Sequence, residues 1–242
     1  MRRAGRIVAG TIDRVLAAVR PGVTTAELDD VAETYIREQG ATPSFLGYGQ
    51  PPFPASICTS LNEEIVHGIP SPDRVAADGD LLKLDFGAIW EGFHSDSAVT
   101  VIVGEPRSAE AEKLVRVTAD ALEAGISSIV AGGRLSDIGA SVQQVAEGAG
   151  FSVVREYVGH GIGTAMHEPP QIPNYKPPGN RGIKIKVGHV FAVEPMVNVG
   201  GWETRLLADD WTVVTSDGSL SAHFEHTIAV TEDGPEVLTA RG

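Results

Sequence analysis

The sequence contains a single cysteine, Cys58, among its 242 residues. A lone cysteine cannot form a disulfide within the chain. Disulfides are typical of secreted domains, whereas proteins in reducing compartments keep their thiols free. The cysteine content therefore fits a cytoplasmic location.

Long apolar runs are missing as well. No segment approaches the ~20 consecutive apolar residues that a membrane helix needs. The N-terminus, MRRAGRIVAGTIDRV, has basic residues but no continuous apolar stretch after them, which argues against a signal peptide. We therefore expect no association with a membrane.

The chain also lacks an excess of positive charge. It carries 19 Lys and Arg residues against 32 Asp and Glu residues, for a net charge of −13. Proteins that bind nucleic acid neutralise phosphates with clustered Lys and Arg. Direct nucleic-acid binding is therefore not expected. The acidity is compatible with a site that collects cations, although surface acids explain the charge equally well.

What the chain does contain is ordinary for a globular protein. Hydrophobic residues make up 42% of it and charged residues 21%, as in typical soluble domains. Its length allows one large domain or two small ones. No linker stands out, so we expect one domain over residues 1–242.

Segments with helical periodicity of apolar residues occur as two pairs along the chain. The expected helices cover residues 3–19, 25–39, 108–130 and 136–147. Thr24 and Glu27 fit a capping box at the start of the second helix, and Gly40 fits its C-terminal stop.

Strand-like segments follow each helix pair. Strands are expected at 55–60, 64–67, 81–89, 93–103, 189–198, 203–207, 211–215 and 222–230, with a strand and glycine-rich turn over 152–163. Residues 41–54 and 164–182 are rich in glycine or proline and are expected to form loops. The order of two helices and then strands thus occurs twice. It predicts an α+β domain of two similar halves, with helices on one face of a mostly antiparallel sheet.

The central stretch Leu81–Val103, LLKLDFGAIWEGFHSDSAVTVIV, is typical of a β-hairpin. Each of its strands carries one acid in an apolar setting, Asp85 and Asp96. A turn centred between Trp90 and Glu91 would place the two acids directly opposite each other. A glycine bulge after that turn would shift the pairing by one residue. Either register brings two carboxylates close together.

Two carboxylates on neighbouring strands repel each other when their Cβ atoms lie ~5 Å apart. A shared proton, a basic partner or a metal ion must offset that repulsion. Lys83 is the nearest basic residue in the sequence. Acids in a hairpin can also be plain solvated residues, so this stretch alone leaves the choice open.

The second half of the chain supplies further candidate ligands. His160 lies in the glycine-rich segment GHGIG, and Glu194 interrupts the apolar segment FAVEPMV. A buried carboxylate is costly unless it is paired or bound to a metal. Pro195 cannot donate to a sheet and marks a strand end or edge. Glu225 and His226 are neighbours on a terminal strand and therefore point to opposite faces.

These residues together form an oxygen-rich donor set of four carboxylates and one imidazole: Asp85, Asp96, His160, Glu194 and Glu225. All are expected on strands or tight turns. Such a mixture suits two divalent ions bridged by carboxylates.

The ordered set and its motifs LDFG, FHSD, GHGIG, MHEPPQIPNY, FAVEPM, DDWTVVT and SAHFEHT resemble those of the type I methionine aminopeptidases. The resemblance runs from about residue 2 to residue 231 and implies the pita-bread fold with two pseudo-symmetric halves. The 33 residues between His160 and Glu194 leave no room for the helical insertion of the type II enzymes. Prolidases share the five ligands but usually add a large N-terminal domain, which we do not expect here because Met1 adjoins the first helix.

The resemblance implies a dinuclear metal site, with cobalt, manganese, iron, zinc or nickel as candidate ions. Asp85 would hold one ion, His160 and Glu194 the other, and Asp96 and Glu225 would bridge both. A metal-bridged hydroxide would attack the scissile carbonyl, with Glu194 as the proton shuttle. A monovalent cation is further implied near Asn62 and Ser221.

The resemblance also implies how substrate is bound. His67 and His167 match positions that contact substrate in the family, although each could be an ordinary loop histidine. Gln50 and Met166 stand where the resemblance implies larger aromatic side chains. The methionine pocket would be lined by Phe53, Cys58 and Trp211.

The function implied is removal of the initiator methionine from nascent proteins whose second residue is small. Nascent N-termini would be the substrate, with transient ribosome contact, and the enzyme would be a monomer. Two alternatives remain: a Pro-specific peptidase of the same fold, and a binding module on that fold that has lost its metals.

Overall fold

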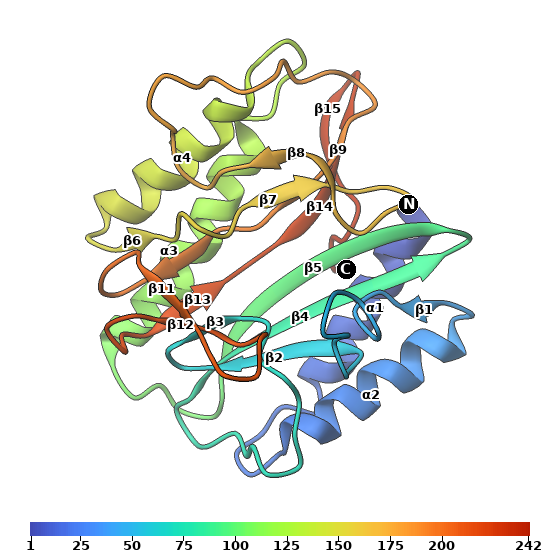
Figure 1. Cartoon of the computed structure of the whole chain (residues 1–242), viewed down its shortest axis with the longest axis vertical. Coiled ribbons are helices and arrows are strands. Elements are labelled where there is room, and N and C mark those ends of the chain that lie inside the picture. The colour runs from blue at the N-terminus through green and yellow to red at the C-terminus, as the bar shows by residue number, and fades with distance from the viewer.

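The structure is a computed structural model and describes all 242 residues. Each half of the chain is a helix pair followed by strands, as the sequence predicts (Figure 1). The first half contains α1 (Arg2–Leu16), α2 (Thr25–Glu38), β1 (Thr42–Pro43), β2 (Ile57–Leu61), β3 (Glu64–Val66), β4 (Leu81–Trp90) and β5 (Phe93–Ile102). The second half contains α3 (Ala109–Ser127), α4 (Leu135–Gly148), β6 (Ser152–Val153), β7 (Gly159–Gly161), β8 (Glu168–Ile172), β9 (Val190–Val193), β10 (Met196–Asn198), β11 (Thr204–Leu206), β12 (Val213–Thr215), β13 (Ser221–His223), β14 (His226–Thr231) and β15 (Gly234–Val237).

All strand pairings are antiparallel, in agreement with the predicted fold class. In the first half, β4 pairs with β5 on one edge and with β1 and β2 on the other. The largest sheet of the second half has the order β15-β14-β9-β7-β8. Two small sheets, β13-β10-β6 and β11-β12-β3, complete the fold, and the latter joins a first-half strand to the second half.

Each helix pair covers strands of its own half. Apolar residues of α1 such as Ile7 and Ile12 pack with Leu84 and Phe86 of β4 in one buried cluster. Leu114 of α3 belongs to a second cluster that also contains residues of α4, β6 and β10. These are the amphipathic faces that the helical spacing predicts. The two pairs lie at opposite ends of the view in Figure 1.

The helix starts agree with the capping signals in the sequence. The Thr24 hydroxyl accepts a hydrogen bond from the Glu27 amide at 3.1 Å, and the Glu27 carboxylate accepts one from the Thr24 amide at 2.8 Å. This capping box is the one predicted for α2.

The central hairpin forms, but its register differs from both predicted alternatives. Its two-residue turn is Glu91-Gly92, and both residues have positive φ, 49° and 79°. Such φ values are typical of a type I′ turn, which suits the twist of a hairpin. Asp85 is therefore opposite Ala98, and Asp96 is opposite Gly87. The acids are diagonal neighbours on one face rather than a directly opposed pair.

The two halves meet along a hydrogen-bonded seam between β5 and residues 223–227. Ala98 and Glu225 exchange backbone hydrogen bonds of 3.3 and 2.9 Å. The Thr100 hydroxyl donates to the His223 carbonyl at 2.7 Å and accepts from the His223 amide at 2.8 Å. This seam fixes strands of the first half against strands of the second.

Two further expectations have clear outcomes. The predicted strand 189–198 is interrupted at Pro195, so that β9 and β10 are separate strands, as its missing amide predicts. The prediction that 41–54 and 164–182 are entirely loop is wrong, because Thr42–Pro43 forms β1 against β4 and Glu168–Ile172 forms β8 against β7. None of the helices has both the length and the apolar composition that crossing a bilayer requires.

Candidate active site

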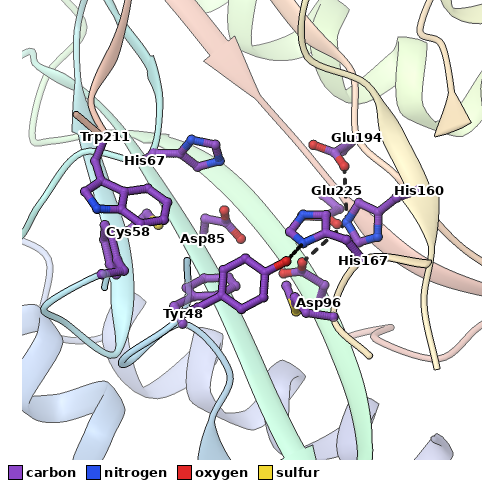
Figure 2. Close-up of a pocket in the computed structure, with 13 residues that line it drawn as sticks. Tyr48, Cys58, His67, Asp85, Asp96, His160, His167, Glu194, Trp211 and Glu225 are labelled. Atoms are coloured by element: carbon purple, nitrogen blue, oxygen red, sulfur yellow. Dashed lines mark hydrogen bonds and ion pairs between the residues drawn. The ribbon is translucent and has the colours of Figure 1, made fainter. Parts of the chain in front are cut away.

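A cavity of about 200 Å³ opens where the two halves meet. Its lining includes all five predicted metal ligands, Asp85, Asp96, His160, Glu194 and Glu225. It also includes both predicted substrate histidines and the three predicted pocket residues, which are His67, His167, Phe53, Cys58 and Trp211. Figure 2 shows Cys58 with Trp211 at one side of this cavity, Asp85 in the middle, and the other acids with His160 at the other side.

The acid end of the cavity draws its side chains from strands of both halves. Asp85 and Asp96 lie on β4 and β5, and His160 lies on β7. Glu194 immediately follows β9, and Glu225 lies between β13 and β14. These donor atoms are close together. His160 Nε2 lies 3.5 Å from Glu194 Oε1 and 3.9 Å from Asp96 Oδ2.

Donor atoms of Asp96, His160 and Glu225 lie within 4.8 Å of one another, and all three residues are buried. Three carboxylate oxygens of the site, Asp85 Oδ1, Asp96 Oδ1 and Glu225 Oε1, are buried without a hydrogen-bond partner. A buried acceptor without a partner is costly. A divalent cation would supply what these oxygens lack, so the donor set fits the predicted metal centre.

The pKa values of the carboxyl groups also support a cation site at the acid end. Burial raises the pKa of Asp85 to about 7. Burial, and then the neighbouring carboxylates Glu225 and Asp85, raise the pKa of Asp96 well above its ordinary value. The pKa values of Glu194 and Glu225 are raised well above ordinary for the same two reasons. In the absence of a cation the carboxyl groups therefore tend to retain protons.

His160 is oriented by its backbone surroundings. It pairs with Ala192 of β9, and a Cβ on the preceding Gly159 would lie 2.4 Å from the Ala192 carbonyl oxygen. Only glycine permits that approach. His160 Nδ1 lies 2.9 Å from the Gly161 carbonyl, which can only accept, so Nδ1 carries the proton. Because burial lowers the pKa of His160 to about 4, the ring is neutral and its Nε2 lone pair faces the acids, ready to bind a metal.

The backbone on both sides of the seam holds the acids in place. The Thr227 hydroxyl accepts from the Asp96 amide at 2.9 Å and donates to the Asp96 carbonyl at 2.7 Å. The Ser97 hydroxyl donates to the Glu225 carbonyl at 2.6 Å. The spacing between Asp96 and Glu225 is thus set by hydrogen bonds between the halves.

His67 and His167 lie between the acid end and the apolar end. His67 adopts a left-handed φ of 60°, and its ring meets Trp211 edge-on with centroids 6.1 Å apart. The ring of His167 lies 4.2 Å from that of His160. Burial lowers the pKa of both, to about 4 for His67. Like Asp85 and Glu194, neither histidine belongs to the tight group of Asp96, His160 and Glu225 donor atoms.

Tyr48 is a cavity residue that the sequence analysis missed. Its hydroxyl lies 2.6 Å from His167 Nδ1 (Figure 2). Burial raises the pKa of the phenol, which therefore keeps its proton. The phenol donates to Nδ1 when the neutral ring carries its proton on Nε2, and accepts from Nδ1 in the other tautomer. No periodic signal identifies Tyr48, because it lies in the irregular segment between β1 and β2.

His223 is a second missed residue. It is 1% exposed, neither ring nitrogen has a hydrogen-bond partner, and Nε2 lies 3.9 Å from Glu194 Oε2. The sequence could have indicated that His223 lies near the acids. It is two residues before Glu225, and alternate residues of an extended strand share a face.

The apolar end of the cavity is built around an aromatic pair. Phe53 and Trp211 meet edge-on with ring centroids 5.1 Å apart. Cys58 is 5% exposed, and burial raises the pKa of its thiol well above the ordinary value, which fits pocket lining rather than a nucleophile. Met166 lines the cavity, whereas Gln50 is exposed and does not.

Asn62 and Ser221, the residues predicted near a monovalent cation, lie together across the seam. Their backbone carbonyls accept hydrogen bonds from the Lys83 ammonium at 2.8 and 3.2 Å. Lys83 forms no ion pair within 4.0 Å. The possibility that Lys83 serves as the basic partner of Asp85 and Asp96 is therefore wrong.

Comparison with solved structures identifies the fold. The prolidase from Pyrococcus furiosus superposes on the whole chain with a TM-score of 0.79 at 20% sequence identity, and the chain covers 63% of that protein. This likeness concerns the pita-bread fold alone. The crystal structure of a methionine aminopeptidase from Thermotoga maritima superposes with a TM-score of 0.95 at 42% identity, covering 100% of this chain and 95% of that one.

Sequence comparison agrees over the full length. The methionine aminopeptidase of Clostridium acetobutylicum is 52% identical over 99% of this chain and 94% of its own length. Methionine aminopeptidase 1 of Bacillus subtilis is also 52% identical, with the same coverage. The model of metallopeptidase family M24 matches residues 1–232. This chain, with its buried acid cluster and neighbouring apolar pocket, therefore belongs to metallopeptidase family M24, among the methionine aminopeptidases.

Proposed function

We propose that the protein removes the initiator methionine from nascent polypeptides whose second residue is small. The observation that carries the proposal is the cavity itself. Four carboxylates, two of them buried and two half-buried, and a neutral imidazole lie directly beside an apolar pocket of Phe53, Cys58 and Trp211. The first part suits a metal-dependent hydrolase, and the second suits an unbranched apolar side chain such as methionine.

We assign two divalent ions to the acid end. Asp85 would contact one ion, His160 and Glu194 the other, and Asp96 and Glu225 both. When bound, such ions would activate water at neutral pH and polarise a peptide carbonyl. Cobalt, manganese, iron, zinc and nickel all accept this donor set, and the choice among them depends on cellular supply as much as on geometry.

Proton transfer is assigned to Glu194. Its carboxyl group is buried within the cavity, and burial raises its pKa well above the ordinary value. A carboxyl group of this kind can hold a proton at neutral pH and release it to a leaving amine. The Asn174 side-chain amide donates to the Glu194 carbonyl at 3.0 Å and steadies this position between β9 and β10.

His67 and His167 are assigned to the substrate. We assign the phenol of Tyr48 as the donor to Nδ1, so that the His167 ring would present its Nε2 hydrogen to the substrate. Neutral imidazole donors near the acid end can stabilise charge that develops on the scissile carbonyl. Because the five ligands already surround the acid end, neither histidine is needed to hold metal.

A peptide panel tests the proposed specificity. Chelated protein reloaded with Mn²⁺, Co²⁺, Fe²⁺, Zn²⁺ or Ni²⁺ is assayed on Met-Ala-Ser and on Ala-Pro peptides. We expect metal-dependent release of methionine from Met-Ala-Ser and little cleavage before proline. Preferential cleavage of Ala-Pro would indicate a Pro-specific peptidase. Bound metal without hydrolysis of either peptide would contradict the proposal, and failure to bind any metal would indicate the binding module.

The cellular setting is part of the proposal. We infer a cytoplasmic, monomeric, single-domain enzyme that meets its substrate at the ribosome. Four exposed basic residues, Lys176, Arg181, Lys184 and Lys186, occur in a segment without acids and could support a transient ribosome contact despite the negative net charge. Co-sedimentation with ribosomes in low and moderate salt, beside size-exclusion chromatography of the free protein, tests contact and oligomeric state.

A further inference from the structure

Lys83 is among the largest fully buried side chains in the molecule, and the proposed reaction does not use it. It is 1% exposed and lies on β4, two residues before Asp85. Burying an ammonium group is expensive unless other groups compensate its charge. No carboxylate lies within ion-pair distance of it, so the compensation must come from elsewhere.

Backbone carbonyl oxygens supply part of the compensation, and burial still lowers the pKa of Lys83 to about 7. Lys83 Nζ donates to the Asn62 carbonyl at 2.8 Å and to the Ser221 carbonyl at 3.2 Å. The Asn62 carbonyl also accepts from the Ser221 amide at 3.1 Å. A compact positive charge resting on carbonyl oxygens is the arrangement by which proteins hold potassium or sodium ions.

The two carbonyls come from segments that are distant in sequence. Asn62 occupies the turn between β2 and β3 with a left-handed φ of 51°, and Ser221 begins β13 of the second half. The turn is held firmly, because the Asn62 side chain donates to Asp80 at 3.0 Å and accepts from the Leu81 amide at 3.1 Å. The ammonium therefore joins β4 to the turn between β2 and β3 and to β13 of the second half.

The same strands carry metal-site acids. Alternate residues of a strand share a face, so Lys83 and Asp85 point to the same side of β4. On the other side of the seam, the chain runs from Ser221 through His223 to Glu225. Fixing Ser221 to β4 thus helps to set the distance between Asp85 and Glu225, two acids from different halves.

We propose that Lys83 is a built-in cation: its ammonium occupies the carbonyl site at Asn62 and Ser221 and makes the divalent-metal site independent of potassium or sodium ions. Lys83 is a positioning residue, since it touches neither substrate nor the reacting atoms. The proposal goes beyond the proposed function and needs it only for the kinetic readout.

Replacement of the ammonium by an exchangeable ion tests this proposal. Wild type and Lys83→Ser are compared in potassium, sodium and tetramethylammonium chloride at one ionic strength. Mn²⁺ affinity is measured by calorimetry, the melting temperature on chelated protein, and Met-Ala-Ser turnover on loaded protein. The serine variant leaves the two carbonyls facing an open space that a small cation can enter. Lys83→Met fills that space with an apolar chain.

For wild type we expect Mn²⁺ affinity and melting temperature to be the same in all three salts. For Lys83→Ser in tetramethylammonium we expect Mn²⁺ affinity to fall by about 10- to 100-fold, the usual cost of losing a group that supports metal ligands. Potassium or sodium should restore most of that loss in a saturable manner. Lys83→Met should show the loss without the rescue.

A matched control is Lys113→Ser, which removes an exposed ammonium that donates to the Ala149 carbonyl at 2.7 Å on the surface. It should show no dependence on the salt. A saturable potassium or sodium dependence of wild type would overturn the proposal. So would equal behaviour of the serine and methionine variants in all salts, or a serine variant that stays unfolded even with potassium and sodium. Because affinity and melting temperature need no peptide, these outcomes stand apart from any failure of the proposed activity.

Discussion

The acid end and the apolar end of the cavity are held by different kinds of backbone. The acid end uses strands and their immediate ends, joined by the seam between β5 and residues 223–227. The apolar end uses mainly irregular segments: Phe53 lies between β1 and β2, Met166 between β7 and β8, and Trp211 between β11 and β12, whereas Cys58 lies on β2. Chemistry that requires fixed distances thus rests on regular structure, whereas the part that shapes specificity rests on loops that can vary at little cost to the fold.

The largest effect is expected from substitutions that remove a bridging acid from the acid end. Asp96→Asn or Glu225→Gln keeps the side-chain shape but removes charge that we assign to both ions. We expect loss of bound metal and of nearly all activity, measured by elemental analysis beside kinetics on Met-Ala-Ser. Glu91→Gln, an exposed acid in the turn of the same hairpin, is the control and should behave as wild type. Normal turnover with normal metal content in either ligand variant would exclude the ligand assignment.

The next effect separates metal ligands from substrate donors. His167→Ala and His67→Ala should retain metal but lose turnover by about 10²–10³, the usual cost of removing one donor to a developing charge. His160→Ala should instead weaken metal binding. Metal content and kcat are measured on the same preparations. A His167→Ala protein without metal, beside a His160→Ala protein that keeps it, would reverse the assignment. Full activity in both substrate-side variants would make them ordinary loop residues.

A smaller effect concerns pH at the acid end. Burial raises the pKa of Asp85 to about 7 and that of Asp96 well above its ordinary value. An acid whose folded-state pKa is raised makes the folded state bind more protons, so its contribution to stability falls as pH rises through that pKa. Metal must displace these protons. We therefore expect apparent Mn²⁺ affinity to rise between about pH 6.5 and 8, by ~10-fold per pH unit for each proton released. Calorimetry in buffers of different ionisation enthalpy counts the protons, and a flat affinity would contradict the raised pKa values.

The smallest effect is expected from a substitution between the acid end and the apolar end of the cavity. Tyr48→Phe removes the hydroxyl that lies 2.6 Å from His167 Nδ1 and that we assign as its donor. A neutral hydrogen bond contributes ~1 kcal/mol, so we expect kcat to fall about five- to tenfold. KM should change less and metal content should stay as in wild type, because the ring of Phe still fills the pocket wall. A kcat equal to that of wild type would show that the hydroxyl does not set the His167 tautomer.

The difference between the two ends also explains what could be predicted from the sequence. Asp85 and Glu194 are acids in apolar strands, and this contrast is visible without a structure. The hairpin register was wrong because the turn is Glu91-Gly92, which lacks the usual Asn or Asp before glycine. The β8 strand was missed because Pro169 and Pro170 lie within it and proline normally excludes a central strand.

Other contacts could not be predicted from the identities of the side chains. Lys83 reads as a lysine on an apolar strand, but its partners are backbone carbonyls of residues 62 and 221, which any amino acid could supply. Tyr48 reaches His167 from an irregular segment whose path depends on the packing of the whole cavity. Contacts of this kind depend on tertiary structure and not on local pattern, so only the structure reveals them.

The central claim is that acids from both halves form one divalent-metal site, and thermal unfolding of chelated protein titrated with Mn²⁺ tests it most directly. A ligand that binds only the folded state stabilises it by ~2.7 kcal/mol at a hundredfold excess over its dissociation constant. For a chain of this size that corresponds to a rise in melting temperature of about 5–10 °C. We predict such a rise for wild type and its absence for Asp96→Asn. An unchanged melting curve for wild type, with Mn²⁺ binding shown independently, would contradict a site shared between the two halves.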